Sequence, residues 1–144
     1  MIAMKKVNAI GFALFLTAMT ALVSCTNQDA GTYSVNSSQL KDGAWKVIYF
    51  WDKDHDETAS LSSYEIIFND DGSVTAVNGS YVISGTWLVG SDDSQPKLIL
   101  TFSVAPFAEI SDDWHVTNQT NNLMNLEDVS GGNGSTELLT LEKI

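Results

Sequence analysis

The sequence predicts an all-β domain, an eight-stranded antiparallel meander that closes into a small barrel. Apolar and β-branched residues occur in short runs, and no run keeps a helical period. Gly, Asn, Asp and Ser separate these runs at intervals typical of hairpins. Closure would remove the exposed edges that consecutive hairpins otherwise leave. A β-sandwich of the same strands is the alternative, because turn chemistry does not determine which strands pair at the ends.

The expected strands alternate between inward and outward residues. In the first strand this alternation places Trp45, Val47, Tyr49 and Trp51 on one face and Phe50 on the other. Asn, Asp and Gly at 69–72 predict a tight turn, because these residues tolerate a positive φ. The eight expected strands are 44–51, 64–68, 73–77, 81–89, 98–102, 114–117, 123–127 and 136–142.

The first 39 residues are predicted to lie outside the barrel domain. Residues 1–24 have the layout of a signal peptide, with two lysines followed by an uncharged apolar run too short for a confident membrane span. Residues 25–39 are rich in Ser, Thr, Asn and Gly and predict a flexible leader. Residues 40–144 form the predicted barrel domain.

The end of the signal, Leu22-Val23-Ser24-Cys25, resembles the lipobox of bacterial lipoproteins. This resemblance implies cleavage before Cys25 and a lipid on its sulfur, which would anchor the protein to a membrane of the bacterial cell envelope, the outer membrane in our interpretation. An ordinary signal peptide with an incidental cysteine is the alternative. A single cysteine cannot form an internal disulfide.

The chain is strongly acidic, with a formal net charge of −11. All seven basic residues are lysines, and two of them precede Cys25, so the processed chain carries −13. Such a surface repels phosphate backbones and anionic headgroups. We therefore expect no nucleic-acid partner and a membrane link through the lipid alone.

Gly43-Ala44-Trp45, the 69–72 turn and Gly85-Thr86-Trp87 follow one another within residues 40–144 and precede an apolar last strand. In this order the motifs resemble the lipocalin-like lipoproteins of Bacteroidetes, relatives of the calycin superfamily, and Gly43-Ala44-Trp45 is similar to the lipocalin Gly-x-Trp. This resemblance implies that Gly43 and Trp45 lie at the closed base of a barrel, where a cation from a late strand covers the indole. The chain contains no arginine, so Lys143 is the expected cation.

No catalytic or cofactor motif stands out in the sequence, which contains two histidines and no nucleophile-elbow, phosphate-loop or zinc-ligand spacing. The acidic run 52–57 resembles the opening of a calcium loop. Glu57, however, stands where that loop needs its glycine, and Ser63 replaces the closing glutamate. We therefore expect a solvated loop, no metal, no cofactor and no enzymatic activity.

Two functions are compatible with such a barrel. The first is binding of a small apolar molecule in an interior cavity. The second is a protein-interaction or protease-inhibitor module with a filled barrel and an N-terminal arm; the oligomeric state stays open in both. Trp45→Ala is expected to be strongly destabilising and Trp114→Ala mild, because 114–117 is a short, polar-flanked strand. The residues expected to line a cavity are Tyr49, Tyr64, Phe68, Tyr81, Trp87, Leu100 and Phe102.

Overall fold

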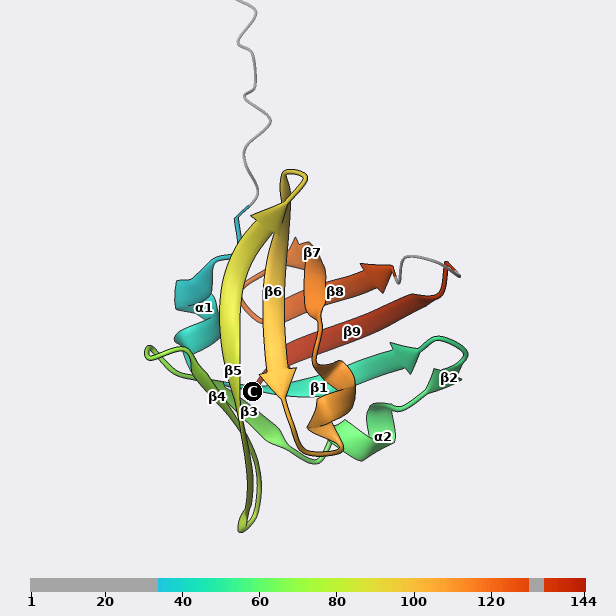
Figure 1. Ribbon diagram of the computed structural model, residues 1–144. Helices are drawn as coiled ribbons and strands as arrows, with labels where there is room; N and C mark the ends of the chain where they lie inside the picture. The colour runs from blue at the N-terminus through green and yellow to red at the C-terminus, as the bar shows by residue number, and fades with distance from the viewer. Residues whose placement is uncertain (1–33, 130–133) are drawn as a thin grey trace, which may run out of the picture.

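A computed structural model describes residues 34–129 and 134–144 of the protein, which form one antiparallel sheet that closes on itself (Figure 1). Neighbouring strands follow the order β2-β1-β3-β4-β5-β6-β7-β8-β9, and the β1–β9 pairing closes the ring. Eight strands make the barrel, and β2 is a short addition to the edge of β1. The predicted all-β barrel is therefore confirmed, and the sandwich alternative does not apply.

Each expected strand is present, with ends displaced by a few residues. The strands are β1 (Ala44–Asp52), β2 (His55–Asp56), β3 (Glu65–Phe68), β4 (Ser73–Asn78), β5 (Tyr81–Asp92), β6 (Gln95–Phe102), β7 (Asp113–Gln119), β8 (Leu123–Val129) and β9 (Thr136–Lys143). Three short helices that the sequence did not predict are α1 (Ser37–Lys41), α2 (Thr58–Leu61) and the 3₁₀ helix η1 (Phe107–Ile110).

The β5–β6 hairpin is longer than predicted and projects beyond the barrel, at the top of Figure 1. Its two turn residues, Asp93 and Ser94, have φ values of 45° and 67°. Positive φ at both central positions is typical of the tight turns that connect twisted strands. The two strands therefore stay paired up to this turn, beyond the last residues that face the core.

A bulge in β1 changes which residues face the core. The register with β9 shifts between Val47 and Tyr49, so Ile48 has no partner on β9. An extra residue reverses the alternation beyond it. Phe50 is consequently fully buried, whereas Ile48 and Tyr49 are exposed. The predicted inward orientation of Tyr49 is wrong for this reason.

Both ends of the barrel are closed by short helices tied to a buried tryptophan. At the end where β1 begins, Leu40 of α1 is buried and its carbonyl accepts a hydrogen bond from Trp45 Nε1 at 2.9 Å. At the opposite end, η1 places Phe107 and Ile110 in the core, and the Ile110 carbonyl accepts from Trp114 Nε1 at 3.0 Å.

Trp114 is therefore a core residue and not the peripheral residue that its polar neighbours suggested. It is fully buried and makes an edge contact with Phe50, at 6.4 Å between ring centroids. Its strand is half-exposed, but η1 covers the inward face at this position. The sequence-based expectation of a mild Trp114→Ala effect is corrected accordingly.

The barrel domain includes residues upstream of the predicted boundary at residue 40. Asn36 caps α1 by accepting a hydrogen bond from the Gln39 amide, and Val35 and Leu40 are buried. The last residues of the predicted leader thus belong to the barrel domain. Cys25, the predicted signal peptide and the rest of the predicted leader lie outside the described residues. The described helices, of four or five residues, are all too short to span a bilayer.

Candidate functional site

Five of the seven predicted cavity residues come together inside the barrel, where they pack as core. Phe68, Leu100 and Phe102 are buried. The rings of Phe68 and Trp87 meet edge-on with centroids 5.4 Å apart, and those of Tyr64 and Phe107 meet at 5.1 Å. Edge-to-face contacts of this kind are typical of a filled interior. These side chains pack against the core and against one another.

The other two predicted residues do not join this group. Tyr49 faces outward because of the β1 bulge. Tyr81 lies opposite Asn78 at the tip of the β4–β5 hairpin and is 73% exposed. Tyr81 lies on the same face of β5 as the inward residues of that strand. As the first residue of β5, however, it lies beyond the end of the core.

The predicted base residues lie together at the end closed by α1. Trp45 and Lys143 are directly opposite each other on β1 and β9. Gly43 has a φ of 91°, and a Cβ there would lie 3.0 Å from Lys143 Cε, so the glycine makes room for the lysine stem. The Lys143 ammonium binds the Asp42 carboxylate at 2.7 Å, so its charge is paired beside the barrel end.

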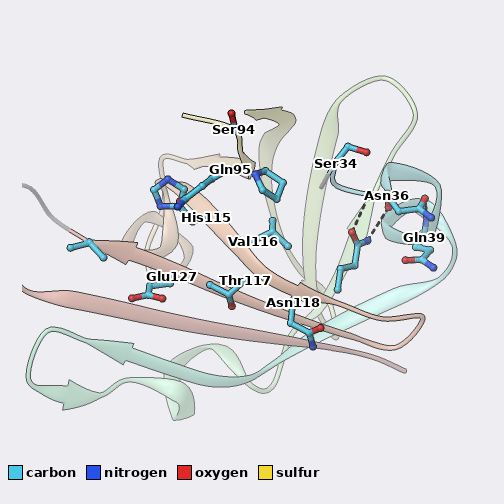
Figure 2. Close-up of a pocket in the computed structure, with 13 residues that line it drawn as sticks. Ser34, Asn36, Gln39, Ser94, Gln95, His115, Val116, Thr117, Asn118 and Glu127 are labelled. Atoms are coloured by element: carbon cyan, nitrogen blue, oxygen red, sulfur yellow. Dashed lines mark hydrogen bonds between the residues drawn. The ribbon is translucent and has the colours of Figure 1, made fainter. Parts of the chain in front are cut away.

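A cleft lies outside the core, where β6 and β7 separate (Figure 2). The two strands pair only between Lys97–Ile99 and Asp113–His115. Beyond His115, β7 continues without β6 as a neighbour. The resulting cleft encloses about 990 Å³ and is bordered by the β5–β6 hairpin, β7, β8 and the segment that leads into α1.

Two local features explain why the strands part here. Pro96 has no backbone N–H to donate, and proline is tolerated in a strand only where pairing is incomplete. The β7–β8 register shifts between Val116 and Asn118, which leaves Thr117 as the extra residue of a bulge. Bulges bend a strand and end regular pairing. The sequence thus opens the sheet between Pro96 and Val116.

One wall of the cleft is a segment of the chain's own N-terminal part, held by Gln119. The Gln119 side chain accepts a hydrogen bond from the Asn36 amide at 2.8 Å and donates one to the Asn36 carbonyl at 3.0 Å (dashed in Figure 2). Gln39 adds a bond to the Asn121 side chain at 2.6 Å. The side-chain amide of Gln119 therefore bonds to the backbone N–H and C=O of Asn36 in the way that the backbone of a neighbouring strand would.

Most side chains that line the cleft carry amide or hydroxyl groups, although carbon atoms make up more of its surface than polar atoms do. Its one carboxylate belongs to Glu127, which lies opposite His115 and is half-buried. Within the described residues Glu127 makes no hydrogen bond or ion pair. This arrangement offers donors and acceptors to a polar ligand and a negative charge to a cation. Sequence reasoning missed the cleft, although the amide-rich stretch 117–122 was a visible signal.

A charged cluster lies beside the cleft on the outer face. Lys97 is 8% exposed and binds both Asp92 and Asp113. Its contact lowers the pKa of Asp113, and the same contact raises the pKa of Lys97. Potential ligand atoms of Asp112, Asp113 and Asp128 lie within 4.8 Å of one another. Burial, followed by the charge of Asp128, raises the pKa of Asp112.

The acidic run 52–57 forms the β1–β2 hairpin, where its groups make local contacts. His55 lies between Asp54 and Glu57, at 2.6 Å and 2.9 Å. The hydrogen bond to Asp54 raises the pKa of His55. Asp56 accepts the Thr58 amide at 2.8 Å. The carboxylates are thus distributed among different partners.

The chain resembles a solved structure in its fold, whereas its sequence matches no known family. No protein-family model matches the chain, and no curated protein matches it. A solved structure of a DUF4847 family protein from Bacteroides vulgatus ATCC 8482 is similar to it, with 15% sequence identity and a TM-score of 0.47, over 74% of this chain and 95% of that one. This likeness supports no conclusion about the function of this chain.

Proposed function

We propose that this protein is a non-catalytic binding module of the bacterial cell envelope, anchored through a lipid on Cys25, and that it binds a partner at the outer cleft. The observation that carries this proposal is the contrast between a packed, closed barrel and an open polar cleft beside it. Of the two functions compatible with the sequence, the geometry favours the interaction module over the carrier of a small apolar molecule.

A carrier needs an apolar cavity and an entrance. Here the inward residues contact one another, as the ring pairs of Phe68 with Trp87 and Phe102 with Phe107 illustrate. Access from either end would require the loss of an indole hydrogen bond, that of Trp45 or that of Trp114. A ligand would then have to displace core side chains.

The polar cleft suits recognition of another polypeptide. Its amide groups present donors and acceptors to polar atoms, and its borders come from three separate parts of the chain. Binding sites on loops and strand ends, held by a rigid scaffold, are a common arrangement. The lipid on Cys25 would hold the module at the membrane surface, where its acidic charge keeps the domain away from anionic headgroups.

The test is a titration of the full chain in detergent with an apolar dye that fluoresces only in dry surroundings, with a detergent blank as control. We expect no saturable increase in fluorescence above the blank. In parallel, Gln95→Trp should fill the cleft from its rim, and Thr75→Trp, on an outward position of β4, is the matched control. Stoichiometric uptake of the dye by the parent, unchanged in Gln95→Trp, would favour the carrier and refute the proposal.

A further inference from the structure

We infer that the uncovered edge of β7 binds an extended peptide segment of another protein, one that carries lysine or arginine, by adding it to the sheet as a strand. The inference deepens the proposed function and rests on it. Four features of the cleft support it: the open edge, its length, the existing contact at Asn36 and the unpaired charge of Glu127.

The edge of β7 is open along part of its length. Asp113–His115 pair with β6, and His115–Gln119 pair with β8. Among residues 34–129 and 134–144, the strand from Val116 to Asn118 therefore has a neighbour on the β8 side only. An edge of this kind presents N–H and C=O groups to the outside, and proteins capture extended peptides by pairing with such edges.

The cleft has the size that a short strand needs. The stretch Val116–Gln119 gives about 10 Å of edge at roughly 3.4 Å per residue. The cleft volume, about 990 Å³, lies at the upper end of the roughly 300–1,000 Å³ that is usual for ligand sites. A segment of about three to five residues would fit along the edge.

The chain already binds an extended segment at the end of this edge. Asn36 has φ −78° and ψ 90°, an extended conformation. Its amide and carbonyl both bond to the Gln119 side chain. An incoming strand would therefore lie between this segment and the β5–β6 hairpin, next to backbone that is held in place by hydrogen bonds.

The charge of the cleft selects the side chain of the ligand. Glu127 is the carboxylate of the cleft, is half-buried and is unpaired within the described residues. A cation beside it would form a charge-assisted hydrogen bond. The net charge of −11 adds steering of basic segments and disfavours a second copy of this chain.

The inference is tested with three dye-labelled, acetylated pentapeptides built of valine and threonine around one central residue. The first has a central lysine and the second a central glutamate. The third has the lysine sequence with N-methyl groups on alternate backbone amides. Fluorescence anisotropy with the detergent-solubilised full chain gives the affinities. Hydrogen exchange locates the protected amides. We expect the lysine peptide to bind, to slow exchange at Val116–Asn118, and to bind about tenfold more tightly than the other two.

Variants separate the inference from the proposed function. Glu127→Gln should weaken the lysine peptide severalfold, whereas Glu109→Gln, on η1 at the other end of the barrel, should leave it unchanged. Equal binding of the N-methylated peptide would overturn strand addition but leave cleft binding intact. Absence of binding by all three peptides also overturns the inference. Protection of Val116–Asn118 that rises with protein concentration, without peptide, would assign the edge to a second copy and overturn it as well.

Discussion

Gly85 of β5 lies so close to β6 that a single methyl group should separate the two strands. It pairs directly with Phe102. A Cβ at this position would lie 2.4 Å from the Thr101 carbonyl oxygen and 2.6 Å from Phe102 Cδ1. The ring can rotate to some extent, but the carbonyl belongs to the backbone of β6. Gly85→Ala is therefore tolerated only if the strands move apart.

The size of the effect follows from this distance. Real Cβ atoms essentially never approach such atoms closer than 3.0 Å, so the strands must part locally by at least about 0.6 Å. Overpacking of this kind costs roughly 1–3 kcal/mol, and a weakened ladder bond beside it adds about 1 kcal/mol. The lower entropy of the unfolded alanine chain returns roughly 0.4–1 kcal/mol. We expect a net loss of about 1–3.5 kcal/mol.

Gly90→Ala is the matched control because Gly90 lies on the same strand. A Cβ there would meet nothing within 4 Å, and neither glycine has a positive φ. We expect Gly90→Ala to be neutral or slightly stabilising. Urea unfolding followed by far-UV circular dichroism compares both variants with the parent. If Gly85→Ala unfolds at the same urea concentration as Gly90→Ala, the close approach of β5 and β6 is wrong.

Three further predictions follow from single residues. Cys25→Ala should move the protein from the membrane fraction to the soluble fraction; sedimentation with membranes after a high-salt wash would contradict the lipid anchor. Trp114→Ala should cost about 3–5 kcal/mol, as Trp45→Ala should, and a much smaller shift in the unfolding midpoint would speak against its burial. Burial raises the pKa of Glu137 despite its contact with Lys53. Its native pKa above the unfolded value means that stability is lost as pH rises through the native pKa. Glu137→Gln should therefore be more stable than the parent at neutral pH, and unfolding at several pH values should show this advantage vanish as the pH falls below the usual pKa of a glutamate, about 4.3.

The strands could be predicted because their signals are local. Alternating apolar residues and turns such as Asn69-Asp70-Asp71-Gly72 act within a few positions of the chain. Gly72 has a φ of 82°, and the turn occurs where the sequence placed it. The bulge at Ile48 could not be predicted in this way, since it is defined by the register of β1 against β9, about ninety residues later. The orientations of Tyr49 and Phe50 depend on this bulge, so they could not be predicted either.

The cleft escaped prediction for the same physical reason. Its wall depends on the bonds between Asn36 and Gln119, which are 83 positions apart. Its opening depends on where β6 stops pairing with β7, and Pro96 alone does not reveal that point. The N-cap at Asn36, in contrast, was a local signal: an asparagine before a short polar segment favours a helix start.

The two tryptophan contacts are the physical reason for proposing that recognition takes place outside this barrel. A helix leaves its last carbonyl groups without partners inside the helix. Trp45 and Trp114 each donate an indole N–H to such a carbonyl, that of Leu40 in α1 and that of Ile110 in η1. The helix in turn keeps the ring from water, since both indoles are fully buried. Opening either end would expose a large aromatic ring and break this bond in one step, a cost of roughly 1.5–3 kcal/mol for the buried side chain and about 1 kcal/mol for the bond. A ligand in the core would have to offset that cost before it gained any contact, whereas one in the cleft meets an edge of β7 that is already open.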